Sequence, residues 1–360
     1  MKRIALHALA SVAALGVLWM TGPAQALTNA EIANLKGPDR SKILLDGAKK
    51  EGKVVLYSPI SANATMRPMS EVFIKKYPGV KLEFWVGGTV ETMQKITAER
   101  RAQNQFADLM EGGTGAYAAI EAGLVEPSTS PSLGVYSKEM YHPFGLWAPS
   151  RVAYMGMAYN TRAVSAAEMP KTFDEFLDPK WKNKMVWVTS TDAGAPLYIA
   201  NLVQTRGKEK AEEYLKKLAD QNVVPFPENL TNMVNRVGQG EYTIALHAPA
   251  HSTLILARQG APVDVQMMDP IPGLLNTIQL IKGAPHPHAA MLFLDYFLGK
   301  EGQTLMSETG YMAVHPEVDP SPHLQKVVPR LAKMKEYVVT PEQLNDTSAL
   351  TRGLFKKYFD

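Results

Sequence analysis

The chain alternates short apolar runs, rich in β-branched residues, with segments of helical periodicity. This alternation limits the possible folds more than any other feature. The run KVVLYS at 53–58 precedes a helical pattern at 65–79, and VKLEFWV at 80–86 precedes another at 89–104. A third apolar run at 106–112 is followed by a short helical segment that ends at Gly123. Strand, loop and helix in turn predict an α/β domain with a largely parallel sheet.

A second alternating block follows a Pro- and Ser-rich stretch at 126–150. Apolar runs at 152–159 and 276–282 connect the two blocks, and the second run returns the chain to the first block. Such a double connection suits hinge closure around a ligand. The 360 residues exceed one comfortable core, so two lobes are expected. We predict a first lobe of 27–155 plus about 279–312 and a second lobe of about 156–278 plus 313–360.

The first 26 residues have the three parts of a secretory signal peptide. Lys2 and Arg3 precede an apolar core, and Ala24 and Ala26 precede the expected cleavage point. An uncleaved membrane anchor is the alternative interpretation. No later stretch has about 20 consecutive apolar residues, so we expect the mature chain to be soluble in the periplasm.

Composition excludes several kinds of chemistry. The chain has no cysteine, so thiol nucleophiles, thiolate metal sites and a lipid-anchored cysteine are excluded. Its formal charge is +3, with acidic and basic residues interspersed. We therefore expect no nucleic-acid partner, because the basic patch that such binding needs is missing.

The ends of the predicted strands point to an anion site. In open α/β sheets, ligands bind beyond the carboxyl ends of the strands. Five such ends here combine Gly, Ser, Thr, Asn and Ala just before a helix, where backbone N–H groups and hydroxyls can bind an anion. Ordinary helix capping would explain any single loop, but five together favour a site. The residues expected to contact the ligand are Ser58, Ser61, Asn63, Gly88, Thr89, Gly113, Thr114, Thr191, Asp192, His247 and His251.

Two histidines in LHAPAHS allow more than one interpretation. His247 and His251 lie four residues apart, but Pro249 between them predicts loop geometry after a strand. They could be pocket donors, strand-end polar groups, or metal ligands together with Asp269. HPH at 286–288 is expected to be a solvated helix start.

Other side chains could add contacts to a ligand. The glycines of GGTGAYA at 112–118 would permit a ligand to approach the backbone closely. Arg151 and Arg67 could supply a charged partner, and Trp85 or Trp187 could stack on a ligand if either faced the site.

Several segments, in order and at the expected spacing, resemble a known family. They include EGKVVLYSPIS, FADLMEGGTGAYAAIEAGLVEP, MGMAYNTRAV and KGAPHPHAAMLFLDYFLGKEGQ. Over nearly all of 45–318 the chain resembles extracellular solute-binding proteins of ABC importers, in the branch of ferric-ion- and thiamine-binding proteins. The resemblance implies a type 2 periplasmic binding fold, with two mixed or parallel sheet domains joined by hinge strands around a ligand cleft. It also implies a monomer that is not an enzyme, needs no cofactor and delivers a small-molecule ligand to an inner-membrane ABC permease.

The departures from this family bear on the ligand. Ferric members carry adjacent tyrosines where this chain has Pro249 and Ala250, and a ligand histidine near Ser61; Glu111 alone remains near a third ligand position. We therefore expect a small organic anion, either a carboxylate or a phosphate or phosphonate ester. The alternatives are thiamine or another cationic heterocycle, held by the tryptophans with Glu111 and Asp192, and ferric iron held without tyrosines. From a different class, a metal-dependent periplasmic hydrolase would use His247, His251 and Asp269.

Overall fold

The computed structural model describes residues 27–190 and 193–359, without the side chains of Thr89 and Val90. The predicted signal peptide at 1–26 lies outside the described residues, as do Thr191 and Asp192. Among the described residues, no helix is long and apolar enough to cross a membrane.

The strands join in the order β2-β1-β3-β9-β4-β7-β5-β6, with β10 on β9 and β8 on β4. Their bounds are β1 Lys53–Ser58, β2 Lys81–Val86, β3 Leu109–Gly112, β4 Ala148–Asn160, β5 Met185–Val188, β6 Val224–Phe226, β7 Ile244–Pro249, β8 Val263–Gln266, β9 Ile271–Leu280 and β10 Glu336–Val339. Parallel pairs (β1 with β2, β1 with β3) and antiparallel pairs (β3 with β9, β4 with β9) occur together. The predicted α/β architecture with mixed sheets is confirmed.

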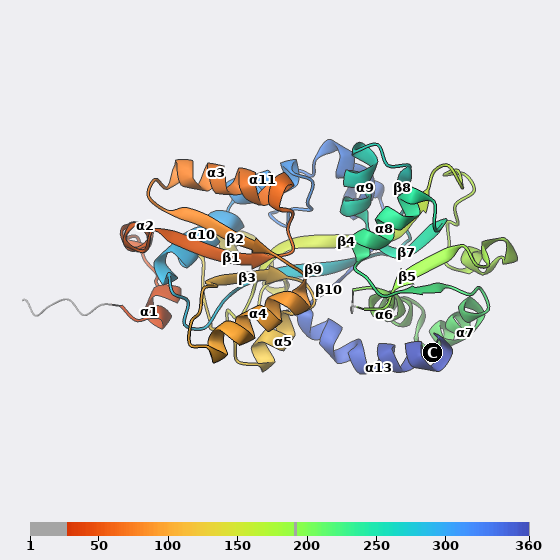
Figure 1. Cartoon of the computed structure of the whole chain (residues 1–360), viewed down its shortest axis with the longest axis horizontal. Helices are drawn as coiled ribbons and strands as arrows, with labels where there is room; N and C mark the ends of the chain where they lie inside the picture. Colours follow the sequence, from red (N-terminus) through yellow and green to blue (C-terminus); the bar gives the residue numbers. More distant parts are fainter. Residues whose placement is uncertain (1–26, 191–192, 360) are drawn as a thin grey trace, which may run out of the picture.

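Helices cover both faces of these strands (Figure 1). Their bounds are α1 Asn29–Ala33, α2 Arg40–Glu51, α3 Arg67–Lys76, α4 Thr89–Arg101, α5 Ala116–Glu121, α6 Ala195–Arg206, α7 Lys208–Ala219, α8 Leu230–Gln239, α9 Ala250–Arg258, α10 Pro287–Leu298, α11 Lys300–Glu308, α12 Pro329–Ala332 and α13 Pro341–Phe359.

Strands β4 and β9 lie at the centre of the molecule, between the two halves (Figure 1). The first part of β4, from Ala148 to Tyr154, pairs with β9, and its second part pairs with β7 and β8. Strand β9 in turn pairs with β3 through Thr277–Leu280. The apolar runs at 152–159 and 276–282 therefore belong to the two strands that connect the halves. The lobe boundaries stay a prediction.

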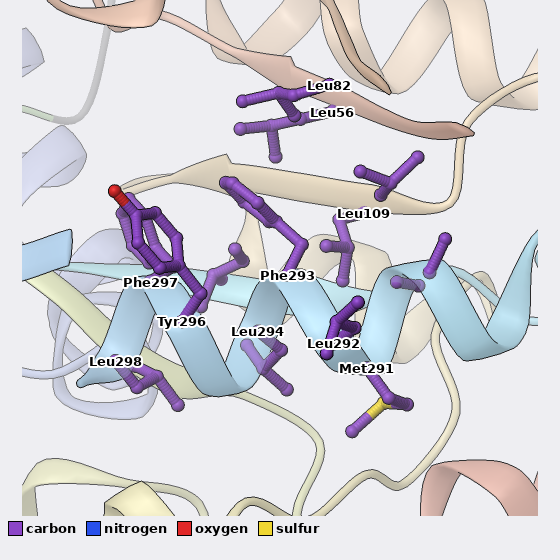
Figure 2. Packing of buried hydrophobic residues seen from close by; sticks show 14 of the residues in the cluster. Leu56, Leu82, Leu109, Met291, Leu292, Phe293, Leu294, Tyr296, Phe297 and Leu298 are labelled. Carbon is purple, nitrogen blue, oxygen red and sulfur yellow. The ribbon is translucent and has the colours of Figure 1, made fainter. Parts of the chain in front are cut away.

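The first half is built around α10, which is apolar on most of its surface because it is enclosed on several sides. Figure 2 shows its aromatic residues pointing toward the strands that carry Leu56, Leu82 and Leu109. Phe293 packs edge-on against Phe73 of α3, with ring centroids 5.3 Å apart. This packing holds α10 and α3 against the strands of the first half.

The second half has a separate core around Trp187, which is fully buried. Phe355 and Phe359 of α13 pack on its indole, with ring centroids 5.6 and 4.5 Å away. Helix α13 begins near α5, below the centre of the molecule, and runs below the second half (Figure 1). Its Glu342 accepts a hydrogen bond from Trp147 Nε1 at 2.7 Å. Trp187 is thus a core residue, as most aromatics at such spacing are, and it cannot stack on a ligand.

The predicted helix start at 286–288 is confirmed, since α10 begins at Pro287, but its two histidines are half-buried and paired with carboxylates rather than solvated. His286 Nδ1 lies 2.9 Å from Asp108 Oδ2, and His288 Nδ1 lies 2.6 Å from Glu51 Oε1. The same carboxylates accept the backbone N–H groups of His286 and Ala289, each at 2.8 Å. They satisfy the free N–H groups of the first turn of α10 and complement its dipole.

Candidate functional site

Ser58, the last residue of β1, is buried and both roles of its hydroxyl are taken. Its Oγ donates to Glu111 Oε2 at 2.7 Å and accepts the backbone N–H of Ile60 at 3.0 Å. Pairing of β1 with β3 brings the two strands side by side and Ser58 next to Glu111. Ser58 therefore holds Glu111 in place and offers little to a ligand.

Glu111 on β3 is the centre of a buried polar network. Its other carboxylate oxygen, Oε1, accepts from Ser150 Oγ at 2.7 Å and from Arg151 Nε at 3.1 Å. Both donors belong to β4. Glu111 is 2% exposed and Arg151 6% exposed, so this is a buried ion pair with hydrogen bonds on both carboxylate oxygens.

Arg151 keeps most of its donors free. A guanidinium carries five N–H groups in a planar fork, and only the Nε–H is used on Glu111. The Nη groups make no hydrogen bond to any residue that the structure describes, and the guanidinium carbon lies 5.1 Å from the centre of the Tyr311 ring. A planar fork with free donors suits a carboxylate or a phosphoryl group.

Tyr311 brings the two halves together at this point. Its hydroxyl accepts the backbone N–H of Ser61 at 3.0 Å, and its ring centre lies 5.1 Å from that of His251 on α9. Arg151 lies against the same ring. We call this group the Arg151 cluster, and its members are Ser58, Ser61, Glu111, Ser150, Arg151, His251 and Tyr311.

The predicted loop between the two histidines is a strand-to-helix junction instead. Strand β7 ends at Pro249 and α9 begins at Ala250, because proline is well tolerated where a helix starts. His251 is the second residue of α9 and is 6% exposed. Its Nδ1 is buried without a partner among the described residues. Burial, and then the charge of Arg151, lower the pKa of His251 to about 3.

His247 lies apart from the cluster. Its Nδ1 is 3.1 Å from the carbonyl oxygen of Ala193, and its ring packs against that of Tyr198 at 5.9 Å. The residue has φ +59°, a region in which non-glycine residues are strained, and its Nε2 is buried without a partner among the described residues. Burial lowers its pKa to about 4. His247 therefore supports the segment after Thr191 and Asp192.

The metal-dependent hydrolase hypothesis is wrong. Within 27–190 and 193–359, no group of three or more His, Asp or Glu side chains is placed to hold a metal ion. Asp269, the proposed third ligand, accepts the backbone N–H of Lys335 at 3.0 Å. The two histidines and Asp269 do not form a centre.

Of the remaining predicted contacts, some already have partners within the protein and others do not. Gly88 donates its backbone N–H to Glu91 Oε2 at 3.0 Å, which is ordinary capping of α4. Asn63 is exposed, and its Oδ1 accepts from Arg67 Nε at 2.9 Å. Thr114 is half-buried, with its hydroxyl unbonded to described residues. The side chain of Thr89, with Thr191 and Asp192, falls outside what the structure describes.

Gly113 has a packing role. A Cβ there would lie 2.8 Å from Leu274 Cδ2 and 3.1 Å from Asn276 Oδ1. The glycine therefore allows side chains of β9 to pack closely at the position where we expected a ligand. Gly113→Ala should lower the free energy of unfolding by about 1–3 kcal/mol through overpacking. Gly134→Ala, where a Cβ meets nothing within 4 Å, is the matched control. Urea midpoints would measure both, and equal stability of the two variants would contradict this packing role.

Four members of the Arg151 cluster are absent from the predicted ligand contacts. Ser150 and Tyr311 were not named at all, Arg151 was named only as a possible charged partner, and Glu111 only for the alternative ligands. The usable signal was a lone cation inside the apolar strand APSRVAYMGMAYN. Trp85 is half-buried against Tyr57, with Lys95 Nζ 5.9 Å from its ring centre. The alternative of a cationic heterocycle held by both tryptophans therefore loses Trp187, which is buried in the core, and Trp85 is half-buried against Tyr57.

A cavity of about 160 Å³ lies beside the connecting strands. It is lined by residues of β4, of 312–320 and 328–330, and by Glu336. Val152 and Tyr154 line it from β4, whereas Arg151, one residue before Val152, is on the opposite face of the strand. None of the predicted contact residues lines this cavity.

Comparison with known proteins shows which family and which relatives this chain is similar to. Residues 107–331 match the sequence profile of a family described as bacterial extracellular solute-binding protein. A Salmonella typhi protein named "Putative 2-aminoethylphosphonate-binding periplasmic protein" is 25% identical over 261 residues, which cover 68% of this chain and 73% of that protein. Iron uptake protein A1 of a Synechocystis species is 23% identical over 248 residues, which cover 65% of this chain and 68% of that protein.

A solved structure extends the likeness to the whole fold. The periplasmic binding protein AfuA from Actinobacillus pleuropneumoniae, with exogenous fructose-6-phosphate bound, superposes with a TM-score of 0.68 at 25% identity. The match covers 85% of this chain and 97% of that one.

Proposed function

Because this chain belongs to the bacterial extracellular solute-binding proteins, we propose that it captures a small organic anion at the Arg151 cluster. The ligand is a carboxylate or a phosphate or phosphonate ester. The protein closes around it by a hinge motion and delivers it to an inner-membrane ABC permease. The family is one of non-enzymatic transport components of the periplasm or cell exterior. The proposal adds the ligand class and the residues that bind it.

The free donors of Arg151 carry this proposal. Its Nε is tied to Glu111, which fixes the orientation of the guanidinium, while the Nη groups stay without a partner among the described residues. A pre-oriented fork binds two oxygens of one anionic group without an ordering cost for the side chain. Because Glu111 balances the charge of Arg151, the site favours an anion through directed hydrogen bonds and close contact.

Arg151 alone is not enough for tight binding. A hydrogen bond to a charged group contributes roughly 1.5–3 kcal/mol, whereas micromolar affinity needs about 8 kcal/mol. Ser61, Thr114 and His251, with the predicted contacts at Thr191 and Asp192, are expected to supply the rest. These residues come from both halves of the molecule, so closure of the halves would complete the site.

The relatives support the phosphoryl part of this ligand class. The Salmonella typhi relative is named for 2-aminoethylphosphonate, and AfuA holds a sugar phosphate. Iron is less suited to this chain, because both carboxylate oxygens of Glu111 are already engaged. Within the organic anions, phosphate and phosphonate esters are therefore the first compounds to test.

The experiment is a thermal-shift screen of the purified protein. The compounds are sugar phosphates, 2-aminoethylphosphonate and other phosphonates, di- and tricarboxylates, thiamine and ferric citrate. A ligand at a hundred times its Kd stabilises the folded state by about 2.7 kcal/mol, which raises Tm measurably. Stabilisation by organic anions is expected. Stabilisation by thiamine or by iron alone would overturn the proposed ligand class.

A further inference from the structure

We infer that His251 makes the site select doubly charged anions over singly charged ones, by taking up a proton when the ligand binds. This inference rests on the proposed function and narrows its ligand class to phosphate and phosphonate monoester dianions. It assigns His251 the role of a specificity-determining residue.

The geometry places an unpartnered imidazole at the edge of the anion site. His251 and Arg151 both lie against Tyr311, each 5.1 Å from the centre of its ring. His251 is only 6% exposed, and its Nδ1 has no hydrogen-bond partner among the described residues. Arg151 is close enough for its charge to lower the pKa of this imidazole, so an anion bound by its free Nη donors would act on the imidazole in the opposite direction.

The charges around α9 leave Arg151 as the group that acts on His251. The elements packed against α9 are β4, β7, β8, α8 and the 3₁₀ helix Pro322–Val327. Their other titratable groups have partners of their own or sit in the core. Asp264 pairs with Lys326, and Arg236 pairs with Glu228 and Glu241. Arg258, on α9 itself, contacts His323, and Tyr154 donates to Glu336. His247 is bonded to the carbonyl of Ala193, and Tyr159 is buried in the second core. Glu111 is paired with Arg151 and balances its charge.

The gain in the proton affinity of His251 differs between a singly charged and a doubly charged ligand. Burial and Arg151 hold the pKa of His251 at about 3, so protonation near pH 7 needs about a ten-thousand-fold gain in proton affinity. One negative charge at about 4 Å supplies roughly a thousand-fold gain at an effective dielectric constant of 20. Two charges supply roughly a million-fold gain. A dianion therefore protonates His251, and a monoanion leaves it neutral.

Matched esters test this difference in charge. Phosphate monoesters are dianions above about pH 6, whereas sulfate monoesters of the same alcohols keep a single charge. At pH 7.5 the protonated imidazole should strengthen phosphate binding about 30-fold. This is the million-fold gain in proton affinity reduced by the cost of protonating, at that pH, an imidazole whose pKa is about 3 without ligand. It should add nothing to sulfate binding.

The experiment is calorimetric titration of the purified protein with methyl, glyceryl and hexose 6-phosphates and with the corresponding sulfates. Runs at pH 7.5 in two buffers of different ionisation enthalpy count the protons taken up. The native chain should take up close to one proton with the phosphates and none with the sulfates. In His251→Gln, proton uptake should vanish and phosphate affinity should fall about 30-fold. His323→Gln, which removes a histidine beside Arg258 outside the cluster, should behave like the native chain.

The outcomes separate the two proposals. Phosphates that bind without proton uptake, or that keep their affinity in His251→Gln, would overturn the role of His251 and leave the proposed function standing. Failure of every phosphate and sulfate ester to bind the native chain would overturn the phosphoryl-anion function, and this inference with it.

Discussion

Replacing Glu111 with alanine is expected to lower the free energy of unfolding by about 3–5 kcal/mol. The change leaves Arg151 buried without its counter-charge and removes the acceptor of the Ser58 and Ser150 hydroxyls. An uncompensated buried charge costs far more than the hydrogen bonds alone. Urea unfolding at pH 7, followed by tryptophan fluorescence, would measure the loss.

The double variant Glu111→Gln with Arg151→Met is the control for this prediction. It removes both charges at once, and replacing a buried ion pair by neutral groups of similar size is often close to neutral for stability. We expect a loss of at most about 2 kcal/mol, because the amide oxygen introduced in place of the carboxylate can still accept a hydrogen bond from a serine hydroxyl. If Glu111→Ala were as stable as the native chain, the buried pair would not be formed in solution.

Acid is expected to destabilise the ligand-free protein through His247 and His251. Burial lowers the pKa of both side chains in the folded state, to about 4 and about 3, from an ordinary value of 6.5. As pH falls below 6.5, the unfolded chain binds protons that the folded chain does not, so stability falls. The loss continues until pH reaches each folded value. At about 1.4 kcal/mol per pH unit and per group, the loss between pH 6.5 and 4.5 is about 5 kcal/mol.

His286 acts in the opposite direction. Its hydrogen bond with Asp108 raises its pKa, so its stabilising contribution is complete below its unfolded pKa and is lost as pH rises through the folded value. The double variant His247→Gln with His251→Gln isolates the acid effect. Its urea stability between pH 6.5 and 4.5 should change by about 5 kcal/mol less than that of the native chain. Parallel pH profiles would show that the two buried histidines do not cause the acid loss.

Much of the fold could be predicted because it is encoded locally. The strand and helix periods of β1, α3, β2 and α4 follow each other within 53–101, and each can be recognised without its neighbours. The two connecting strands were recognisable as long apolar runs. The bracing of both halves by α13 could not be predicted, since it depends on where Phe355 and Phe359 meet Trp187, a residue far away along the chain.

The site was only partly predictable, because small residues at strand ends serve several purposes. Gly88 is explained by capping and Gly113 by packing against β9, and composition cannot separate these roles from ligand contact. The ion pair of Glu111 with Arg151 depends on β3 and β4 both pairing with β9, a register that no local pattern contains. A lone arginine in an apolar strand is the one signal that pointed there.

Native mass spectrometry tests the central claim, capture of an organic anion at Arg151, most directly. The native chain and the double variant Glu111→Gln with Arg151→Met would be purified side by side from the same periplasm. We predict extra mass on the native protein that is released on denaturation, that corresponds to a phosphate, phosphonate or carboxylate compound, and that is absent from the variant. The same mass on both proteins, or a captured metal or cationic heterocycle, would contradict the account.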